Sequence, residues 1–306
     1  MKIVIAGGSG FLGEALSAAC AKNGDDVAVL TRGAGGANPA PRVRLVRWTP
    51  NGGTGAWGSE LNGADAVINL AGESIAAKRW SDAQKQRIED SRMRATRSLV
   101  EAINAAASPP PVFVSGSAVG YYGPHADEVV TEETPAGRDF LARLCVKWEA
   151  EAERASSKRV RVIELRTGLV LDRTGGALPK MLLPFKLGAG GRVGSGQQYW
   201  PWIHIDDWVE MVRWAIATTG LTGPVNATAP NPVTNTDFAH FLGDAMSRPA
   251  LLPAPAFALR LVLGEMADAL LLSGQRAVPA KAQGLWFTFR YPRLDGALEK
   301  IFGGSR

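Results

Sequence analysis

A glycine-rich turn directly after the first predicted strand constrains this chain more than any other feature. Residues 2–6 form a short apolar run, GGSGFLG occupies positions 7–13, and a helical stretch follows from Glu14 to Lys22. A strand, a glycine turn and a helix in this order form the context in which G-x-G-x-x-G predicts dinucleotide binding. Glycine allows the tight turn, the close approach of a pyrophosphate and the packing of helix on strand. An ordinary glycine-rich βα turn is the alternative interpretation.

The turn and the helix that follows it predict a pyrophosphate site. A helix N-terminus offers free N–H groups and the positive end of the helix dipole to an anion. The residues that we expect to contact the cofactor here are Gly7, Gly8, Ser9, Gly10, Phe11, Leu12 and Gly13.

The end of the second predicted strand bears on the choice of dinucleotide. That strand covers residues 27–30 and ends at Thr31 and Arg32, before a Gly/Ala/Pro-rich segment at 33–41 that we expect to be a loop. An NAD site usually carries an acidic residue about 20 positions after the glycines to bind the ribose 2′-hydroxyl. No acid stands here, whereas Arg32 can pair with a 2′-phosphate. The sequence therefore predicts NADP(H) in preference to NAD(H); a solvated arginine is the alternative.

The order of predicted elements indicates an α/β fold. Apolar strands are predicted at 43–48, 66–70, 112–117 and 160–165, and they alternate with helices at 81–107 and 140–155. Near-continuous apolar strands between helices predict a doubly wound parallel sheet, a Rossmann domain. From Gly175 the composition changes, and the tail is mostly helical. We expect a Rossmann domain of residues 1–171 plus about 201–227, and a smaller, mostly helical C-terminal domain of about 172–200 plus 228–306.

Charge and cysteine content exclude several classes of protein. The net charge of +5 comes from scattered basic residues with no block of like charge, so no nucleic-acid interface is predicted. Two cysteines, Cys20 and Cys145, make no disulfide framework and fit a reducing compartment. No apolar run reaches the roughly 20 residues of a membrane span. The first predicted strand begins at Lys2, so no signal peptide is expected before it. A cytoplasmic protein without signal peptide or membrane contact is expected.

Ligands of an open parallel sheet bind beyond the carboxyl ends of its strands. Several predicted strands end in small or polar residues, which we therefore expect to meet at one cofactor. The further predicted cofactor contacts are Thr31, Arg32, Leu70, Ala71, Gly72, Ser115, Arg166 and Thr167. No set of His, Cys and acidic residues has metal-ligand spacing, so no metal site is predicted.

At this point the chain resembles the extended short-chain dehydrogenases/reductases, the group of the nucleotide-sugar epimerases. The matching segments are Gly7-x-x-Gly10-x-x-Gly13, Asn69-Leu70-Ala71-Gly72, Ser115-x-Ser117 before Tyr122-Gly123, and Ile203-His204-Ile205-Asp206-Asp207. The segments 140–149 and 200–204 and the tail from Arg248 to Phe302 resemble an atypical epimerase-like subfamily with its own C-terminal extension. The resemblance implies an NADP-type cofactor, an active site over Ser117, and a monomer or homodimer.

In the resembled family, a tyrosine and a lysine four residues later form the acid/base pair. Aligning the helix at 140–155 on Glu149 places Leu141 and Cys145 at those two positions, and Lys147 lies two residues out of register. The usual pair is therefore missing. Ser117 remains as a candidate that orients a substrate oxygen, and Tyr122 as a candidate proton carrier. Aromatic packing is the alternative for Tyr122.

The remaining candidates are substrate contacts. They are Glu73, Tyr121, Trp202 and His204. The alternatives are a surface carboxylate for Glu73, packing for the two aromatic residues, and a buried structural histidine. Asp206 and Asp207 can cap the helix that follows them. Arg87 and Arg92 of the long helix are expected to be solvated.

Two functions follow from these observations. The first is an NADP-dependent oxidoreductase or nucleotide-sugar epimerase acting on a small molecule whose identity the sequence does not give. The second is a non-catalytic sensor or scaffold that binds NADP, and the missing Tyr-x-x-x-Lys pair favours it. The retained Ser115 and Ser117 and the strand-end loops favour the first.

Overall fold

A seven-stranded parallel sheet forms the centre of the computed structural model, which describes residues 1–33 and 39–303. Its strands are β1 (Lys2–Ala6), β2 (Asp26–Thr31), β3 (Val43–Arg47), β4 (Ala66–Asn69), β5 (Val112–Ala118), β7 (Arg161–Thr167) and β11 (Gly223–Ala227). The spatial order is β3-β2-β1-β4-β5-β7-β11, and every neighbouring pair is parallel. The order reverses between β1 and β4, which is where a doubly wound sheet opens its ligand crevice. The predicted fold class is confirmed.

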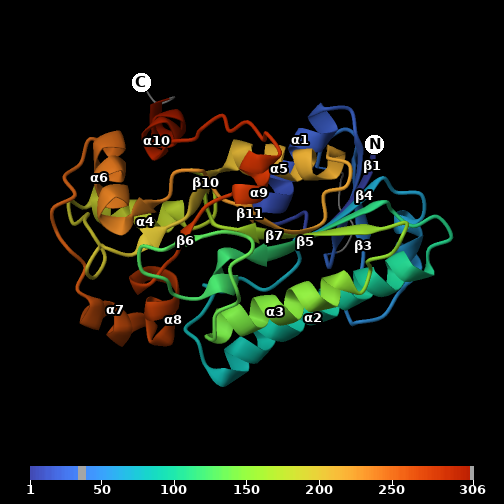
Figure 1. Cartoon of the computed structure of the whole chain (residues 1–306), viewed down its shortest axis with the longest axis horizontal. Coiled ribbons are helices and arrows are strands. Elements are labelled where there is room, and N and C mark those ends of the chain that lie inside the picture. Colours follow the sequence, from blue (N-terminus) through green and yellow to red (C-terminus); the bar gives the residue numbers. More distant parts are fainter. Residues whose placement is uncertain (34–38, 304–306) are drawn as a thin grey trace.

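Helices cover both faces of this sheet (Figure 1). α2 (Asp82–Ala105) and α3 (Phe140–Glu153) lie side by side on one face, and α1 (Phe11–Lys22), α5 (Ile205–Ala217) and α9 (Ala280–Gly284) lie on the other. Because side chains alternate along a strand, successive residues enter different cores. Ile5 packs in the cluster that contains Trp208 of α5, whereas Val4 packs in the cluster that contains Leu99 of α2.

A second, mostly helical lobe lies beyond the β11 edge of the sheet (Figure 1). Its helices are α4 (Leu178–Lys186), α6 (Asn235–Met246), α7 (Ala256–Leu263), α8 (Glu265–Ala267) and α10 (Leu294–Phe302). The short remaining elements are η1 (Ala56–Leu61), η2 (Val119–Tyr122), β6 (Val129–Val130), β8 (Leu169–Leu171), β9 (Tyr199–Trp200), β10 (Trp202–His204), β12 (Val233–Thr234), η3 (Asp268–Leu272) and β13 (Arg276–Ala277). Trp202 belongs to the core of this lobe, although it lies in the range predicted for the Rossmann domain.

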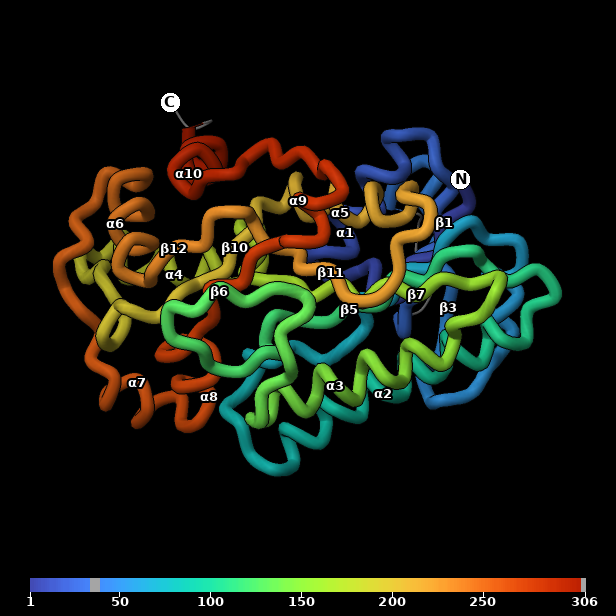
Figure 2. The backbone as a smooth tube through the Cα atoms, viewed as in Figure 1, coloured from blue at the N-terminus to red at the C-terminus, as the bar shows by residue number. Residues whose placement is uncertain are grey.

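The C-terminal segment returns from the second lobe to the sheet (Figure 2). α9 packs on β11, and Ala282 of α9 is buried in the same core as α1 and α5. Asp207 fixes the continuation of this segment, because its carboxylate accepts the N–H groups of Arg290 and Tyr291 at 2.8 Å each. The predicted role of the two aspartates as helix caps is therefore corrected. α5 begins earlier, at Ile205, and its cap is His204, whose Nδ1 accepts the N–H of Asp206 at 3.1 Å.

The long helix α2 begins as predicted, with the Ser81 Oγ accepting the N–H of Gln84 at 3.2 Å. Arg87 is exposed, as expected. Arg92 is half-buried and makes contacts within the protein instead. Its Nη1 donates to the carbonyl of Glu73 at 2.9 Å, its guanidinium lies 5.1 Å from the Trp148 ring centroid, and desolvation lowers its pKa.

Within residues 1–33 and 39–303, none of the helices has the length and apolarity required to cross a membrane. The predicted loop at 33–41 includes residues 34–38, which lie outside the described residues.

Candidate functional site

The glycine turn after β1 is closed by contacts that no side chain could share. Gly7 has φ +79°, and a Cβ at this position would lie 2.7 Å from the carbonyl carbon of Leu70, at the exit of β4. A Cβ on Gly13 would lie 2.4 Å from the carbonyl oxygen of Gly7. The turn, the first turn of α1 and the β4 exit therefore pack backbone against backbone. This brings the predicted contacts Gly7–Gly13 and Leu70–Gly72 together at the switch point of the sheet.

The surface that this turn leaves open fits a pyrophosphate. Ser9 and Gly10 are exposed, and no side chain caps the amino end of α1 at Gly10. The N–H groups of the first helical turn are consequently available to an anion, on the positive side of the helix dipole. Residues 7–13 are thus suited to hold a dinucleotide.

Thr31 and Arg32 lie at the carboxyl end of β2, next to β1. The Thr31 Oγ1 accepts the N–H of Gly33 at 3.3 Å, which turns the chain away from the sheet. Arg32 is exposed, and among the described residues its guanidinium has no hydrogen-bond or ion-pair partner. A free guanidinium at this strand end remains available for a phosphate.

The loop after β4 is fixed to α2. The Asn69 Oδ1 accepts the N–H of Ala71 at 3.2 Å, and its Nδ2 donates to the Thr96 Oγ1 at 2.9 Å. Glu73 is half-buried, and its carboxylate accepts a hydrogen bond from the Gln84 Nε2 at 2.7 Å. Glu73 therefore anchors this loop to α2, and whether it contacts a substrate stays a prediction.

Ser117 is held by a buried ion pair. Its Oγ lies 2.5 Å from the Glu149 Oε1 of α3. The same carboxylate forms two hydrogen bonds with Arg166 of β7, 2.9 Å from Nε to Oε1 and 2.8 Å from Nη2 to Oε2. The side chains of Arg166 and Glu149 are 4% and 12% exposed, so the pair is largely removed from water. This geometry fixes both the position of Ser117 and the direction in which its hydroxyl points.

Tyr122 belongs to the same network and is not placed as a proton carrier. Its hydroxyl donates to the Asn226 Oδ1 at 2.7 Å and accepts from the Arg166 Nη1 at 3.0 Å. Burial raises the pKa of Tyr122 to about 12. Tyr121 is half-buried and stacks on the guanidinium of Arg166, whose Cζ lies 3.4 Å from its ring centroid. These contacts favour a structural role for Tyr122 and leave Tyr121 nearer to a ligand.

Four further predicted site residues have structural partners within the fold, and their roles as ligand contacts stay predictions. Trp202 has no exposed surface, and its indole N–H donates to the carbonyl of Asn231 at 3.1 Å. His204 caps α5 and stacks on Tyr291 with ring centroids 4.1 Å apart, and burial lowers its pKa. Ser115 is buried within β5, and the Thr167 Oγ1 accepts the indole N–H of Trp208 at 3.2 Å. Packing therefore accounts for all four side chains.

Arg166 was a predicted cofactor contact, and the structure gives it other partners. Besides Glu149, its Nη1 donates to the Tyr122 hydroxyl and to the carbonyl of Glu132 at 3.3 Å. With its guanidinium engaged in this way, Arg166 is better suited to position Ser117 through Glu149 than to bind a phosphate.

Apart from Glu149, the groups of α3 that face the Ser117 loop are apolar or neutral. The Leu141 side chain packs against Gly120, and the Cys145 Sγ lies 3.8 Å from the carbonyl oxygen of Ala118. Lys147 points away and pairs with Glu89 of α2 at 2.6 Å. This agrees with the alignment that places Leu141 and Cys145 at the usual acid/base positions, so neither a phenol nor an ammonium from α3 faces Ser117.

Burial predicts that both cysteines are unreactive in the folded protein. It raises the pKa of Cys145 to about 12 and that of Cys20 to about 11, and the thiolate is the reactive form. We expect Ellman's reagent at pH 8 to modify neither thiol in the native protein and both in 6 M guanidinium chloride. Rapid modification of one thiol in the native state would contradict the burial described here.

Sequence reasoning missed four polar residues of this region: Glu132, Glu149, Glu164 and Asn226. The Glu132 Oε1 accepts the N–H of Asn226 at 3.0 Å, and its Oε2 accepts the N–H of Lys281 at 3.2 Å. Glu164 has a buried Oε2 with no hydrogen-bond partner among the described residues, and desolvation raises its pKa to about 8. A signal was present, because Glu164 and Arg166 interrupt an otherwise apolar strand.

Comparison with known families matches most of this chain. Residues 3–226 match the family described as the NAD dependent epimerase/dehydratase family. Residues 254–301 match a family described as a domain of unknown function, DUF1731. The second match covers the helical tail that follows α6.

Individual relatives match over nearly the whole length. The epimerase family protein Mb2239 of Mycobacterium bovis is 42% identical over 296 residues, which cover 97% of this chain and 96% of that protein. The chloroplastic SDR39U1 homolog of Arabidopsis thaliana is 39% identical over 303 residues, with 98% and 86% covered. The crystal structure of human epimerase family protein SDR39U1 (isoform 2) with NADPH superposes with a TM-score of 0.90 at 35% identity, covering 99% of both chains.

Proposed function

Because the chain belongs to the NAD dependent epimerase/dehydratase family, we propose that it is an NADP(H)-dependent oxidoreductase or epimerase acting on a small molecule. The observation that carries this proposal is the combination of the open glycine turn at residues 7–13 with Arg32 at the end of β2, whose guanidinium has no partner within residues 1–33 and 39–303. The human relative crystallised with NADPH supports the same cofactor here.

The role proposed for each residue in binding follows from its position in the fold. The first turn of α1 holds the diphosphate, Arg32 holds the 2′-phosphate, and residues 70–72 cover the cofactor from the β4 side. When bound, the nicotinamide supplies the hydride donor or acceptor. Ser117, fixed by Glu149, orients the reacting oxygen of the substrate.

Arg32→Ala is expected to weaken NADPH binding by about 10- to 100-fold, because a charge-assisted contact to the 2′-phosphate contributes about 1.5–3 kcal/mol. NADH lacks that phosphate, so its affinity should change less than about threefold. Titration of purified protein with each nucleotide, followed by nucleotide fluorescence, measures both values.

A matched control removes a different arginine, from the neighbouring strand. Arg44 lies near the amino end of β3, opposite Ala28 and away from the carboxyl ends of the strands, and it pairs with Glu60 at 2.7 Å. Arg44→Ala should leave the ratio of NADPH to NADH affinity unchanged. Equal losses for both nucleotides in Arg32→Ala would contradict the 2′-phosphate assignment, and no binding of either nucleotide to the wild type would contradict the proposed function.

One observation favours a second candidate, a non-catalytic NADP(H)-binding sensor. α3 presents Leu141 and Cys145 to the Ser117 loop, so it supplies no acid/base pair there. Ser117→Ala distinguishes the two candidates. An oxidoreductase loses hydride transfer when the hydroxyl is removed, whereas a sensor retains its nucleotide affinity and has no turnover to lose.

A further inference from the structure

The hydroxyl of Ser117 has only one proton, and the structure gives that proton a partner. The Ser117 Oγ and the Glu149 Oε1 are 2.5 Å apart. Glu149 already receives two N–H donors from Arg166, a cation at any accessible pH, so its carboxylate accepts hydrogen bonds and has none to donate. The Ser117 hydroxyl is therefore the donor in this contact.

A serine that donates its proton to one partner presents only lone pairs to any other. A hydroxyl carries one donor and two acceptor sites, so a ligand beside Ser117 meets an acceptor. A ligand hydroxyl can donate to it. A ligand carbonyl cannot, and would place two acceptors against each other in a site with little water.

The contacts around Glu149 and Ser117 keep the serine hydroxyl donating to the carboxylate. Arg166, which could reorient Glu149, is itself fixed by the hydroxyl of Tyr122 and the carbonyl of Glu132. Beside Ser117, the Cys145 Sγ contacts the carbonyl oxygen of Ala118 at 3.8 Å, so this thiol has its own hydrogen-bond acceptor. Reversing Ser117 would require breaking a buried, charge-assisted contact.

We propose that Ser117 acts as a hydrogen-bond acceptor towards its ligand, with Glu149 as its positioning residue, and that the site selects a compound bearing a hydroxyl over the corresponding ketone. This inference rests on the proposed function, and it names the chemical class of the substrate: an alcohol. The expected preference is about tenfold or more, which is typical of an unpaired buried polar group.

The test compares two probes that differ by two hydrogens, cyclohexanol and cyclohexanone. Each is titrated into the full-length protein saturated with NADPH, and its dissociation constant is measured by ligand-observed NMR. The wild type should bind the alcohol about tenfold or more tightly than the ketone. Ser117→Ala should bring the ratio to about one, because the acceptor is gone.

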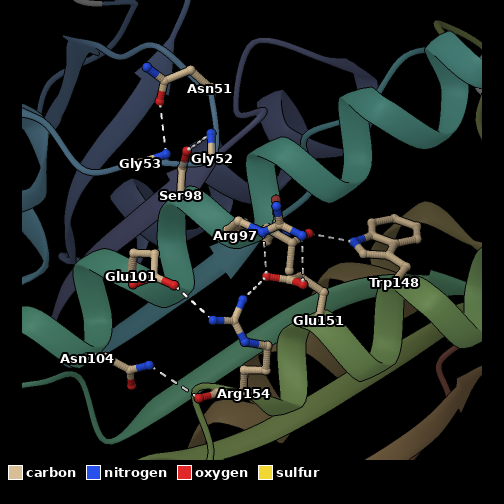
Figure 3. Close-up of polar contacts among 12 residues, drawn as sticks. Asn51, Gly52, Gly53, Arg97, Ser98, Glu101, Asn104, Trp148, Glu151 and Arg154 are labelled. Atoms are coloured by element: carbon tan, nitrogen blue, oxygen red, sulfur yellow. Dashed lines mark hydrogen bonds and ion pairs between the residues drawn. The ribbon is translucent and has the colours of Figure 1, made fainter.

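Glu149→Gln and Glu151→Gln form a matched pair on α3. Glu149→Gln disturbs the carboxylate that holds Ser117, and the alcohol preference should fall towards one. Glu151 lies on the α2 side of the same helix, where it pairs with Arg97 at 3.2 Å and with Arg154 (Figure 3). Glu151→Gln should keep the wild-type preference.

Two kinds of failure are distinguishable. If NADPH does not bind, the proposed function fails, and the two probes are then compared on the nucleotide-free protein. If NADPH binds and the wild type shows equal affinities, a preference for the ketone, or no Ser117-dependent binding of either probe, the inference about polarity is overturned while the cofactor assignment stands. Should Glu149→Gln unfold, the wild type and Ser117→Ala still decide the matter.

Discussion

Arg166→Met is expected to lower the free energy of unfolding by about 3–5 kcal/mol, because it leaves the Glu149 carboxylate buried without its counterion. In the folded protein that carboxylate receives two N–H donors from Arg166 and one O–H donor from Ser117. Removing the guanidinium also takes a donor from the Tyr122 hydroxyl and the cation from beneath the Tyr121 ring. Urea unfolding at pH 7 measures the change.

The double variant Glu149→Leu/Arg166→Met tests the reason for this cost. If the loss arises from an uncompensated buried charge, then removing both charges should restore part of the stability, because replacing a whole buried ion pair by apolar side chains is often close to neutral. A double variant less stable than Arg166→Met would show that the arginine stabilises the protein mainly through its other contacts.

Arg97→Met is the matched control on the other side of α3. Arg97 pairs with Glu151 at 3.2 Å, but its side chain is 51% exposed (Figure 3). Water already solvates the arginine of this pair, and Glu151, which is 10% exposed, keeps Arg154 as a partner, so the substitution should cost about 0–1 kcal/mol. A loss as large as that of Arg166→Met would contradict the distinction between the buried and the exposed pair.

The sheet and the glycine turn after β1 could be predicted because their signals are local. The glycine turn, the apolar strands and the Ser81 cap each depend on residues within a few positions of one another, and all three are confirmed. Arg32 could be chosen as a candidate for the same reason, since the residue that faces the ribose stands about 20 positions after the glycines.

The network around Ser117 could not be predicted, because its members meet only in the folded chain. Glu149 comes from α3, Arg166 from β7 and Asn226 from β11, and the Tyr122–Asn226 bond joins residues 104 positions apart. Local pattern also did not reveal that Trp202 and His204 are buried. An aromatic and polar segment is as typical of a pocket wall as of a core, and only the packing of α6 and the tail shows which one it is here.

Glu164→Gln is expected to stabilise the protein at pH 8.5, by an amount on the order of 2–5 kcal/mol. Glu164 lies in β7 between the strands β5 and β11, and it is 4% exposed. Its Oε2 has no hydrogen-bond partner among the described residues, and Arg166, two residues along the strand, is engaged by Glu149. Burial therefore raises the pKa of Glu164 from 4.5 to about 8.

The sign of the pH dependence follows from that shift. Between pH 4.5 and about 8 the folded protein keeps the Glu164 proton while the unfolded chain releases it, so the contribution of this group to stability falls as pH rises through that window. Glutamine cannot ionise, so the advantage of Glu164→Gln should be near zero at pH 4.5 and largest above pH 8. Urea unfolding of both proteins at pH 4.5 and above pH 8 measures this difference in stability.

Glu299→Gln, which changes an exposed carboxylate on α10, should show no pH-dependent difference in stability from the wild type. A difference between Glu164→Gln and the wild type that does not vary with pH would mean that Glu164 is already ionised in the folded protein, and that Arg166 or Lys281 compensates its charge.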